Sequence, residues 1–198
     1  MQAWPSPDLL KRAERILIYA AATAKTVILT YRKGTDADVS LAWAPKIVVE
    51  GASDADWALA HSTSAYIFKL CGAAISWAMK KQESIALHTM EAEIHAGSLA
   101  ACDAVFIRGI TEEVGYKQTQ PTVLRMDNTS GISLANDPMF HAKAKHINRR
   151  DLYIRELVER KVIRTEYIAS GDNPADMLTK PLDKQLFQKH RATIMGAT

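Results

Sequence analysis

The chain has 198 residues, 47% of them hydrophobic, so it is long enough to bury one sizeable core. Its formal net charge of +3 is small, so charge alone neither requires nor excludes a nucleic-acid partner. Two cysteines, Cys71 and Cys102, are too few for a disulfide framework or a zinc site, and they suit a reduced intracellular setting. We expect both to be small core residues.

The first 45 residues predict a helix and a short strand. The helix runs from Asp8 onward, with Ser6 as its N-cap and Pro7 at the first helical position. Its apolar stretch, Ile16 to Ala24, is too short to span a bilayer. A signal peptide is the alternative, but no small-residue cleavage site stands out and the helix accounts for the same residues. A strand is expected over Thr26 to Tyr31.

Three β-type runs follow in close succession, over Ile47 to Ala52, Thr63 to Leu70 and Ala74 to Met79. Because the breaks between them are short, they predict an antiparallel meander. A long helix is expected next, from Thr89 to Val114, with Gly115 as the residue that ends it.

The second half of the chain alternates strands and helices. A strand is expected over Thr122 to Met126, followed by a short helix and then by an amphipathic helix over His146 to Lys161. A further β run covers Ile163 to Ala169, and a last helical region begins at about Pro174. A meander followed by β-α-β crossovers predicts an α/β fold. Its mixed five-stranded sheet is flanked by helices, and the late strands run parallel to the first.

Two aspartates close strands that should end at the same edge of this sheet. Asp54 follows the first β run, and Asp127 follows the fourth. Ligands bind at the carboxyl ends of neighbouring strands in such sheets, and hard cations take carboxylate oxygens as ligands. The alternative for either residue alone is a capping role, since Asp is common at strand ends and before helices.

The long helix carries two glutamates that must project from different faces, because Glu91 and Glu93 are only two residues apart. Steps of three and four from Glu93 reach a stripe of small and apolar residues suited to packing on a sheet: Gly97, Ala100, Ala104 and Ile107. A carboxylate at the head of this stripe is costly to bury without cationic partners, so Glu93 is the better candidate metal ligand. Glu91 is expected to be solvated.

A fourth acid, Asp176, follows Asn173 and Pro174, which are interpreted as an N-cap and a first helical residue. An aspartate in a first helical turn is favoured by the helix dipole alone, so a structural role is the alternative.

At this point the chain resembles a known family, the ribonuclease H domain of copia-type retrotransposon Pol polyproteins. The resemblance covers about residues 46 to 185 and is carried by these stretches: Ser53 to Ala58, Ser62 to Tyr66, Ile75 to Trp77 with Lys80 to Gln82, Glu91 to Glu93, Met126 to Asn128, Phe140 to Ile147, and Ala175 and Asp176 with Leu178 to Leu182. Single motifs of this kind are weak, but seven in series rarely arise by chance.

The resemblance implies a site of four acids, Asp54, Glu93, Asp127 and Asp176, as catalytic residues and as ligands of two Mg²⁺ ions, for which Mn²⁺ can substitute. The choice of Asp54 over Asp56 rests on the resemblance, because both side chains leave a strand on the same face. The residues expected to bind nucleic acid are Lys80, Lys81, Asn128, Lys143, Lys145 and Arg149. His141 and His146 are expected to be structural or to lie at the edge of the substrate.

The implied function is cleavage of the RNA strand of an RNA/DNA hybrid during retrotransposon reverse transcription. Residues 1 to 45 resemble the tail that links a reverse transcriptase to this domain, residues 46 to 185 form the ribonuclease H-like domain, and residues 186 to 198 form a C-terminal tail. The expected partners are the hybrid and the reverse transcriptase domain of the same polyprotein. We expect an intracellular protein, in a cytoplasmic retrotransposon particle or in the nucleus, that is neither secreted nor bound to a membrane.

Two other functions remain open on the sequence. The stretch Trp57 to Ser62 is several residues shorter than in the family, and a displaced Asp54 would leave an inactive domain that only binds or tethers nucleic acid. An integrase-type or resolvase-type nuclease would need a different arrangement of acids and would cut DNA.

Overall fold

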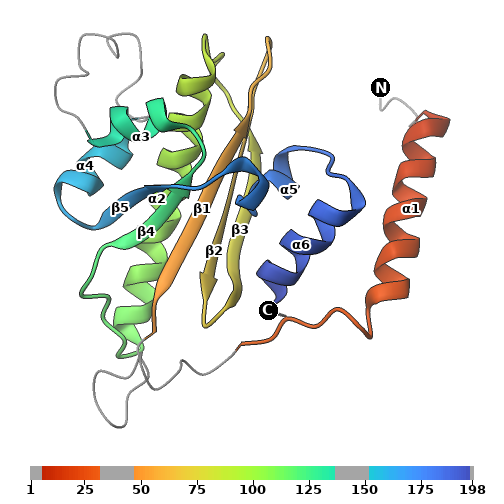
Figure 1. The fold of residues 1–198 in the computed structure, drawn as a ribbon, viewed down its shortest axis with the longest axis horizontal. Helices are drawn as coiled ribbons and strands as arrows, with labels where there is room; N and C mark the ends of the chain where they lie inside the picture. Colours follow the sequence, from red (N-terminus) through yellow and green to blue (C-terminus); the bar gives the residue numbers. More distant parts are fainter. Residues whose placement is uncertain (1–5, 32–46, 137–151, 197–198) are drawn as a thin grey trace.

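The computed structural model describes residues 6–31, 47–136 and 152–196. Its elements are, in chain order, α1 (Pro7–Thr23), β1 (Val49–Asp56), β2 (Thr63–Leu70), β3 (Ala73–Lys81), α2 (Thr89–Glu113), β4 (Thr122–Met126), α3 (Thr129–Asn136), α4 (Tyr153–Glu159), β5 (Ile163–Tyr167), the short 3₁₀ helix η4 (Ser170–Asp172), α5 (Asp176–Thr179) and α6 (Lys184–Met195). Figure 1 shows how these elements surround one sheet.

The sheet has five strands in the order β3-β2-β1-β4-β5. The first three strands form the expected antiparallel meander, and β4 lies parallel to β1 on one side and to β5 on the other. The mixed sheet and the direction of the late strands are therefore confirmed. Because β1 and β4 run in the same direction, their carboxyl ends lie at the same edge of the sheet.

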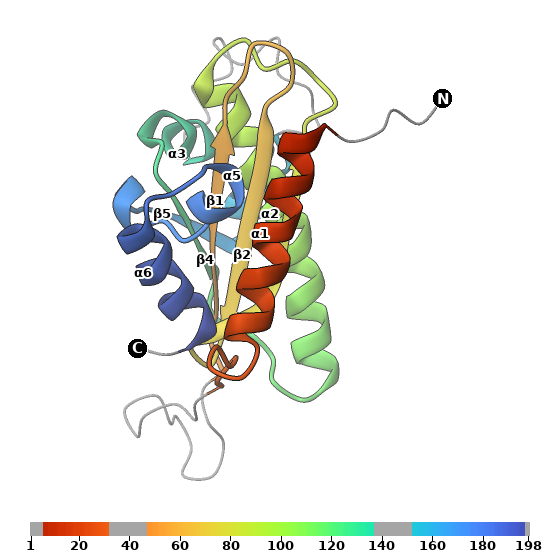
Figure 2. The same ribbon diagram turned by 90° about the vertical axis from the view of Figure 1, so that its right-hand side faces the viewer.

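Helices cover both faces of the sheet. The long helix α2 packs against β1 and β2, whereas α5 and α6 lie on the opposite side, as the two views in Figure 1 and Figure 2 show. Helix α1 lies beyond α6, where Tyr19 packs edge-on against Phe187 at a ring distance of 5.8 Å. No helix in residues 6–31, 47–136 and 152–196 is long and apolar enough to cross a membrane.

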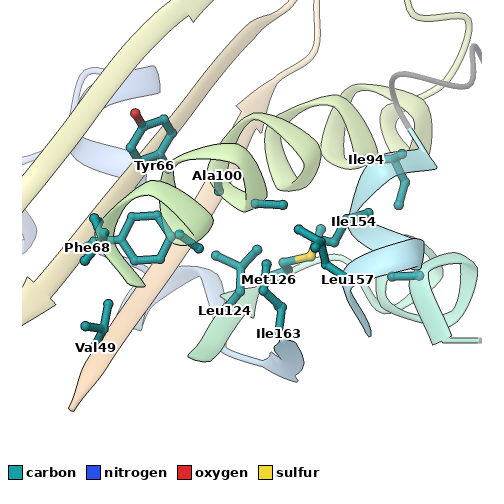
Figure 3. Close-up of a cluster of buried hydrophobic side chains, with 14 of the residues drawn as sticks. Val49, Tyr66, Phe68, Ile94, Ala100, Leu124, Met126, Ile154, Leu157 and Ile163 are labelled. Carbon is teal, nitrogen blue, oxygen red and sulfur yellow. The ribbon is translucent and has the colours of Figure 1, made fainter. Parts of the chain in front are cut away.

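The main core fills the space between the sheet, α2 and α4 (Figure 3). The stripe predicted on α2 is buried as expected: Gly97, Ala100, Ala104 and Ile107. A methyl group on Gly97 would lie 3.0 Å from Ile154 Cδ1 and 3.2 Å from Met126 Cε, so the absence of a side chain lets α4 and β4 approach the helix closely. Each large side chain buried here contributes roughly 1.5–3 kcal/mol to folding.

Three sequence predictions about the chain outside the core are wrong. Residues 26–31 form no strand: Thr26 still belongs to the turn after α1, and the contact of Thr30 N with Met195 O at 2.8 Å is one backbone bond and makes no ladder. Cys71 is only half-buried because it lies in a two-residue hairpin turn with φ of 52°, next to Gly72 with φ of 85°. Cys102 is exposed on α2.

Two of the differences between the predicted and the observed element ends bear on the site. Strand β1 continues to Asp56 because it pairs with β2 as far as the contact between Asp56 and Thr63, so Asp54 lies inside the strand and not after it. The last helical region is two helices, α5 and α6, with Pro181 between them. The first part of the predicted helix from His146 lies outside the described residues, and its remainder is α4.

Candidate active site

Three aspartates from distant parts of the chain meet at one end of the sheet. Asp54 comes from β1, Asp127 directly follows β4, and Asp176 begins α5 (Figure 1). One carboxylate oxygen of each lies within 4.8 Å of the others. Asp54 and Asp176 are buried and Asp127 is half-buried, so the cluster opens to solvent on the Asp127 side.

The alternation of side chains along β1 explains why Asp54 reaches α5. Ala55 packs against Ala92 and Ala96 of α2 on one face of the sheet. Because neighbouring strand residues point to opposite faces, Asp54 faces the other side, where α5 lies. The Thr179 hydroxyl on α5 donates to Asp54 Oδ2 there.

Glu93 approaches the cluster from the second turn of α2. It is 6% exposed, its Oε2 has no hydrogen-bond partner among the described residues, and its carboxylate accepts a hydrogen bond from the Ala55 backbone. Burial, followed by the negative charges of Asp54 and Asp127, raises the pKa of Glu93 to about 9. Glu93 is therefore electrostatically part of the cluster, although it is not one of the three acids within 4.8 Å.

Polar side chains hold the aspartates in place. The Ser170 hydroxyl of η4 donates to Asp127 Oδ2 at 2.6 Å. Asn173 donates from Nδ2 to Ser53 O at 3.0 Å and accepts at Oδ1 from Ala175 N at 3.1 Å, so it ties the segment before Asp176 to β1. The predicted helix start at Pro174 is wrong, because α5 begins at Asp176, but Asn173 makes the expected capping contact with the Ala175 amide.

Lys180 adds a positive charge beside two of the aspartates. Its Nζ lies 3.3 Å from Asp54 Oδ1 and 3.3 Å from Asp176 Oδ2. Burial and the charge of Asp54 raise the pKa of Asp176 to about 6, against the effect of Lys180. Burial would lower the pKa of Lys180, but the two carboxylates outweigh it and the pKa is raised.

The donor set fits divalent cations. Glu93 Oε2 and Asp176 Oδ1 are buried oxygens without a hydrogen-bond partner in the described part of the chain, which is costly in a protein interior. The Lys180 ammonium contacts two of the four carboxylates, and hard cations such as Mg²⁺ take oxygen ligands of this kind. These residues could hold such ions and so recover the energy lost by burying like charges together.

The structure distinguishes the members of two pairs of acids that are close in sequence, Asp54 with Asp56 and Glu91 with Glu93. Asp54 lies in the cluster, whereas Asp56 is exposed at the end of β1. The prediction that Glu91 is solvated is wrong: it is 6% exposed, and its Oε2 accepts from Leu87 N at 2.7 Å. The physical reason is that the amide groups before and within the first turn of a helix lack partners, and Glu91 supplies one at the start of α2.

The chain is 34% identical over 165 residues to a retrovirus-related Pol polyprotein from transposon TNT 1-94 of Nicotiana tabacum, which covers 81% of this chain and 12% of that protein. It is 31% identical over 194 residues to the corresponding polyprotein from transposon RE1 of Arabidopsis thaliana, covering 96% of this chain and 12% of that one. The chain is thus homologous to one segment of the retrovirus-related Pol polyproteins of plant transposons. It spans about 12% of the length of these Pol polyproteins.

The chain is also similar to a secreted effector protein and to solved ribonuclease H structures. The chain is 37% identical over 107 residues to secreted RxLR effector protein 161 of Plasmopara viticola, covering 52% of this chain and 68% of that protein. No protein-family model matches. Ribonuclease H1 of Halobacterium salinarum shares 15% identity at a TM-score of 0.45 over 66% of this chain and 92% of that chain, and the ribonuclease H domain of Rv2228c from Mycobacterium tuberculosis shares 13% at 0.42 over 77% and 98%.

Three of the other residues expected to be functional, Lys80, Lys81 and Asn128, lie in the described part of the chain. Lys80 and Lys81 are exposed at the end of β3, on a groove of about 380 Å³ between β3 and α2, and Lys80 pairs with Glu83 at 3.3 Å. Asn128 Oδ1 accepts from Gly131 N at 3.0 Å and so caps α3. Five predicted positions lie outside the described residues: His141, Lys143, Lys145, His146 and Arg149.

Sequence reasoning did not assign a site role to three residues that contact the acids, Ser170, Thr179 and Lys180. Thr179 and Lys180 belong to one of the stretches that carried the resemblance. The available signal was spacing, because Lys180 follows Asp176 by four residues, the distance at which helical side chains meet. Nothing in the sequence around Ser170 indicated its contact with Asp127.

Proposed function

We propose that this Pol segment is a ribonuclease H that hydrolyses the RNA strand of an RNA/DNA hybrid, with Asp54, Glu93, Asp127 and Asp176 as its metal-binding acids. The observation that carries the proposal is the meeting of three aspartates within 4.8 Å, with Glu93 buried beside them. The similarity to transposon Pol polyproteins supports it, since retrotransposons copy RNA into DNA and pass through such a hybrid. The ions would be two Mg²⁺, for which Mn²⁺ can substitute.

The residues of this site have two proposed roles, to bind the cations and to orient the acids that bind them. Asp54, Asp127, Asp176 and Glu93 would hold the cations, and bound Mg²⁺ would supply activation of water and stabilisation of negative charge on the departing 3′ oxygen. Ser170 orients Asp127, which lies on the open side of the cluster and is the acid best placed to meet the substrate phosphate. The products of this hydrolysis carry 5′ phosphates.

Selectivity for a hybrid would come from sensing 2′-hydroxyls on the cleaved strand, so base sequence should matter little. Lys80 and Lys81 are exposed and line the groove along β3, and they are proposed to contact backbone phosphates. The hybrid and the reverse transcriptase domain of the same polyprotein are the proposed partners. A retrotransposon particle or the nucleus is the proposed location, and residues 46 to 185 are the proposed catalytic domain.

The alternative, a domain that binds nucleic acid without cutting it, depended on displacement of Asp54 by the short connection after β1. In this connection Trp57 Nε1 donates to Ala86 O at 3.0 Å and Ala58 N donates to Ser62 Oγ at 3.3 Å, so it closes as a compact turn. Asp54 remains within 4.8 Å of Asp127 and Asp176. This geometry supports the nuclease over the alternative.

The test is cleavage of a labelled RNA/DNA hybrid in Mg²⁺, with single-stranded RNA and duplex DNA as other substrates. The Asp127→Asn variant should lose about a hundredfold or more of the activity. Asp56→Asn is the matched control, since it removes an exposed aspartate from the same end of the sheet and should keep activity. A folded wild-type protein that binds the hybrid without cutting it would favour the binding domain, and cutting of duplex DNA would favour the integrase-type alternative.

A further inference from the structure

The Lys180 ammonium forms ion pairs with two buried aspartates, through one carboxylate oxygen of each. Its Nζ lies 3.3 Å from Asp54 Oδ1 and 3.3 Å from Asp176 Oδ2, and the side chain is 35% exposed. The other oxygen of Asp54 accepts the Thr179 hydroxyl. Both oxygens of Asp54 are therefore already engaged, one by a hydroxyl and one by an ammonium.

The backbone fixes Lys180 in this position. The Lys180 N–H donates to Asp176 O at 2.9 Å, which closes the single turn of α5. The lysine also acts on Glu93, since its charge opposes the rise in the pKa of that residue. One flexible ammonium thus offsets part of the charge of three acids, at the place where a cation has to bind.

We propose that Lys180 is an internal counter-ion of the acidic cluster, which bridges Asp54 and Asp176 before metal binds and leaves Asp54 Oδ1 and Asp176 Oδ2 when divalent cations enter. This inference rests on the metal site of the proposed function and adds a positioning residue to it. The partial exposure of Lys180 and its long flexible stem give the ammonium a route into solvent.

The counter-ion has two opposite consequences. Without divalent cations, it stabilises the folded protein by reducing repulsion among the carboxylates. With divalent cations, it competes for the same oxygens and repels the incoming charge, so it lowers their affinity. A residue that only supported the fold would have a different signature, since its removal would loosen the ligands and weaken metal binding.

The test is calorimetric titration of Mg²⁺ into the metal-free protein, together with thermal denaturation in EDTA, for wild type and Lys180→Met. The variant should melt at a lower temperature in EDTA and bind Mg²⁺ about tenfold more tightly. Lys180→Arg keeps the charge and should bind within about twofold of wild type. Lys117→Met is the matched control, because Lys117 is an exposed lysine that pairs with Glu112 at 2.7 Å, near the end of α2 and away from the acidic cluster.

The outcomes separate this inference from the proposed function. Equal or weaker Mg²⁺ binding by a folded Lys180→Met protein overturns the counter-ion while the metal site stands. Absence of saturable Mg²⁺ binding in both wild type and variant overturns the metal site and the counter-ion with it. If Lys180→Met does not fold, Lys180→Gln is titrated in its place with the same expected tightening, because its amide can still donate to Asp54.

Discussion

Replacing Glu93 by glutamine should stabilise the metal-free protein, and the gain should increase with pH. Burial and the neighbouring aspartates raise the pKa of Glu93 from 4.5 to about 9 in the folded state. The folded protein then keeps a proton that the unfolded chain releases above pH 4.5. The stability linked to this proton is complete below pH 4.5 and is lost as pH rises towards 9.

The size of the gain follows from this shift. One pKa unit corresponds to about 1.4 kcal/mol, so the cost that Glu93 imposes is about 3 kcal/mol at pH 7 and under about 1 kcal/mol at pH 5. Glutamine cannot ionise and avoids this cost. The variant should therefore exceed wild type in free energy of unfolding by these amounts, and added Mg²⁺ should reduce the difference by stabilising wild type more.

The assay is urea denaturation in EDTA at pH 5, 7 and 8.5. Glu113→Gln, an exposed glutamate at the end of the same helix, is the control and should change stability by less than about 0.5 kcal/mol. A difference between Glu93→Gln and wild type that does not change with pH would refute the reasoning. It would mean that Glu93 is ionised in the folded protein without a metal ion.

Two further predictions concern the framework of the site. Gly51→Ala should lower the thermal midpoint by several degrees, corresponding to about 1–3 kcal/mol, because the new Cβ would lie 2.3 Å from Cε1 of the buried Phe68 ring. Gly109→Ala lies on an exposed part of α2, where the new Cβ would have nothing within 4 Å. It should raise the free energy of unfolding by about 0.5–1 kcal/mol and the thermal midpoint with it, and an equal effect of both changes would contradict the assigned packing. Asn173→Ala should cost about 1–3 kcal/mol in urea denaturation by leaving the buried Ser53 carbonyl without its donor, and should weaken Mg²⁺ binding measured by calorimetry. Unchanged Mg²⁺ affinity in that variant would mean that Asn173 does not position Asp176.

Local sequence was enough to predict most of the framework. The bounds of β2 and β4 match the predicted runs, and α2 ends at Glu113, before Gly115 with φ of 93°. These features depend on neighbours in the chain, such as side-chain alternation, helical spacing and the tolerance of glycine for positive φ. The parallel direction of β1 and β4 followed from the order of the elements, and with it the expectation that Asp54 and Asp127 lie at one edge.

Tertiary packing decided what the local pattern left open. Spacing alone could not distinguish Asp54 from Asp56, nor show that Glu91 is buried at the start of α2. Those outcomes depend on which segment lies against each side chain. Cys102 and the segment before Tyr31 were predicted wrongly for the same reason, since no local signal reports whether a partner covers them.

The clearest case is the bridge from Lys180 to Asp54, which joins residues 126 positions apart. The sequence by itself indicated that two strands carrying aspartates end at one edge of the sheet and that Glu93 heads a buried helix face, because side-chain alternation and helical spacing are local. The complete set of four acids came from the family resemblance. Only the folded chain determined that an ammonium shares their site. The energy of that contact depends on burial and on distances of a few ångströms between distant segments, and neither is written in the local pattern.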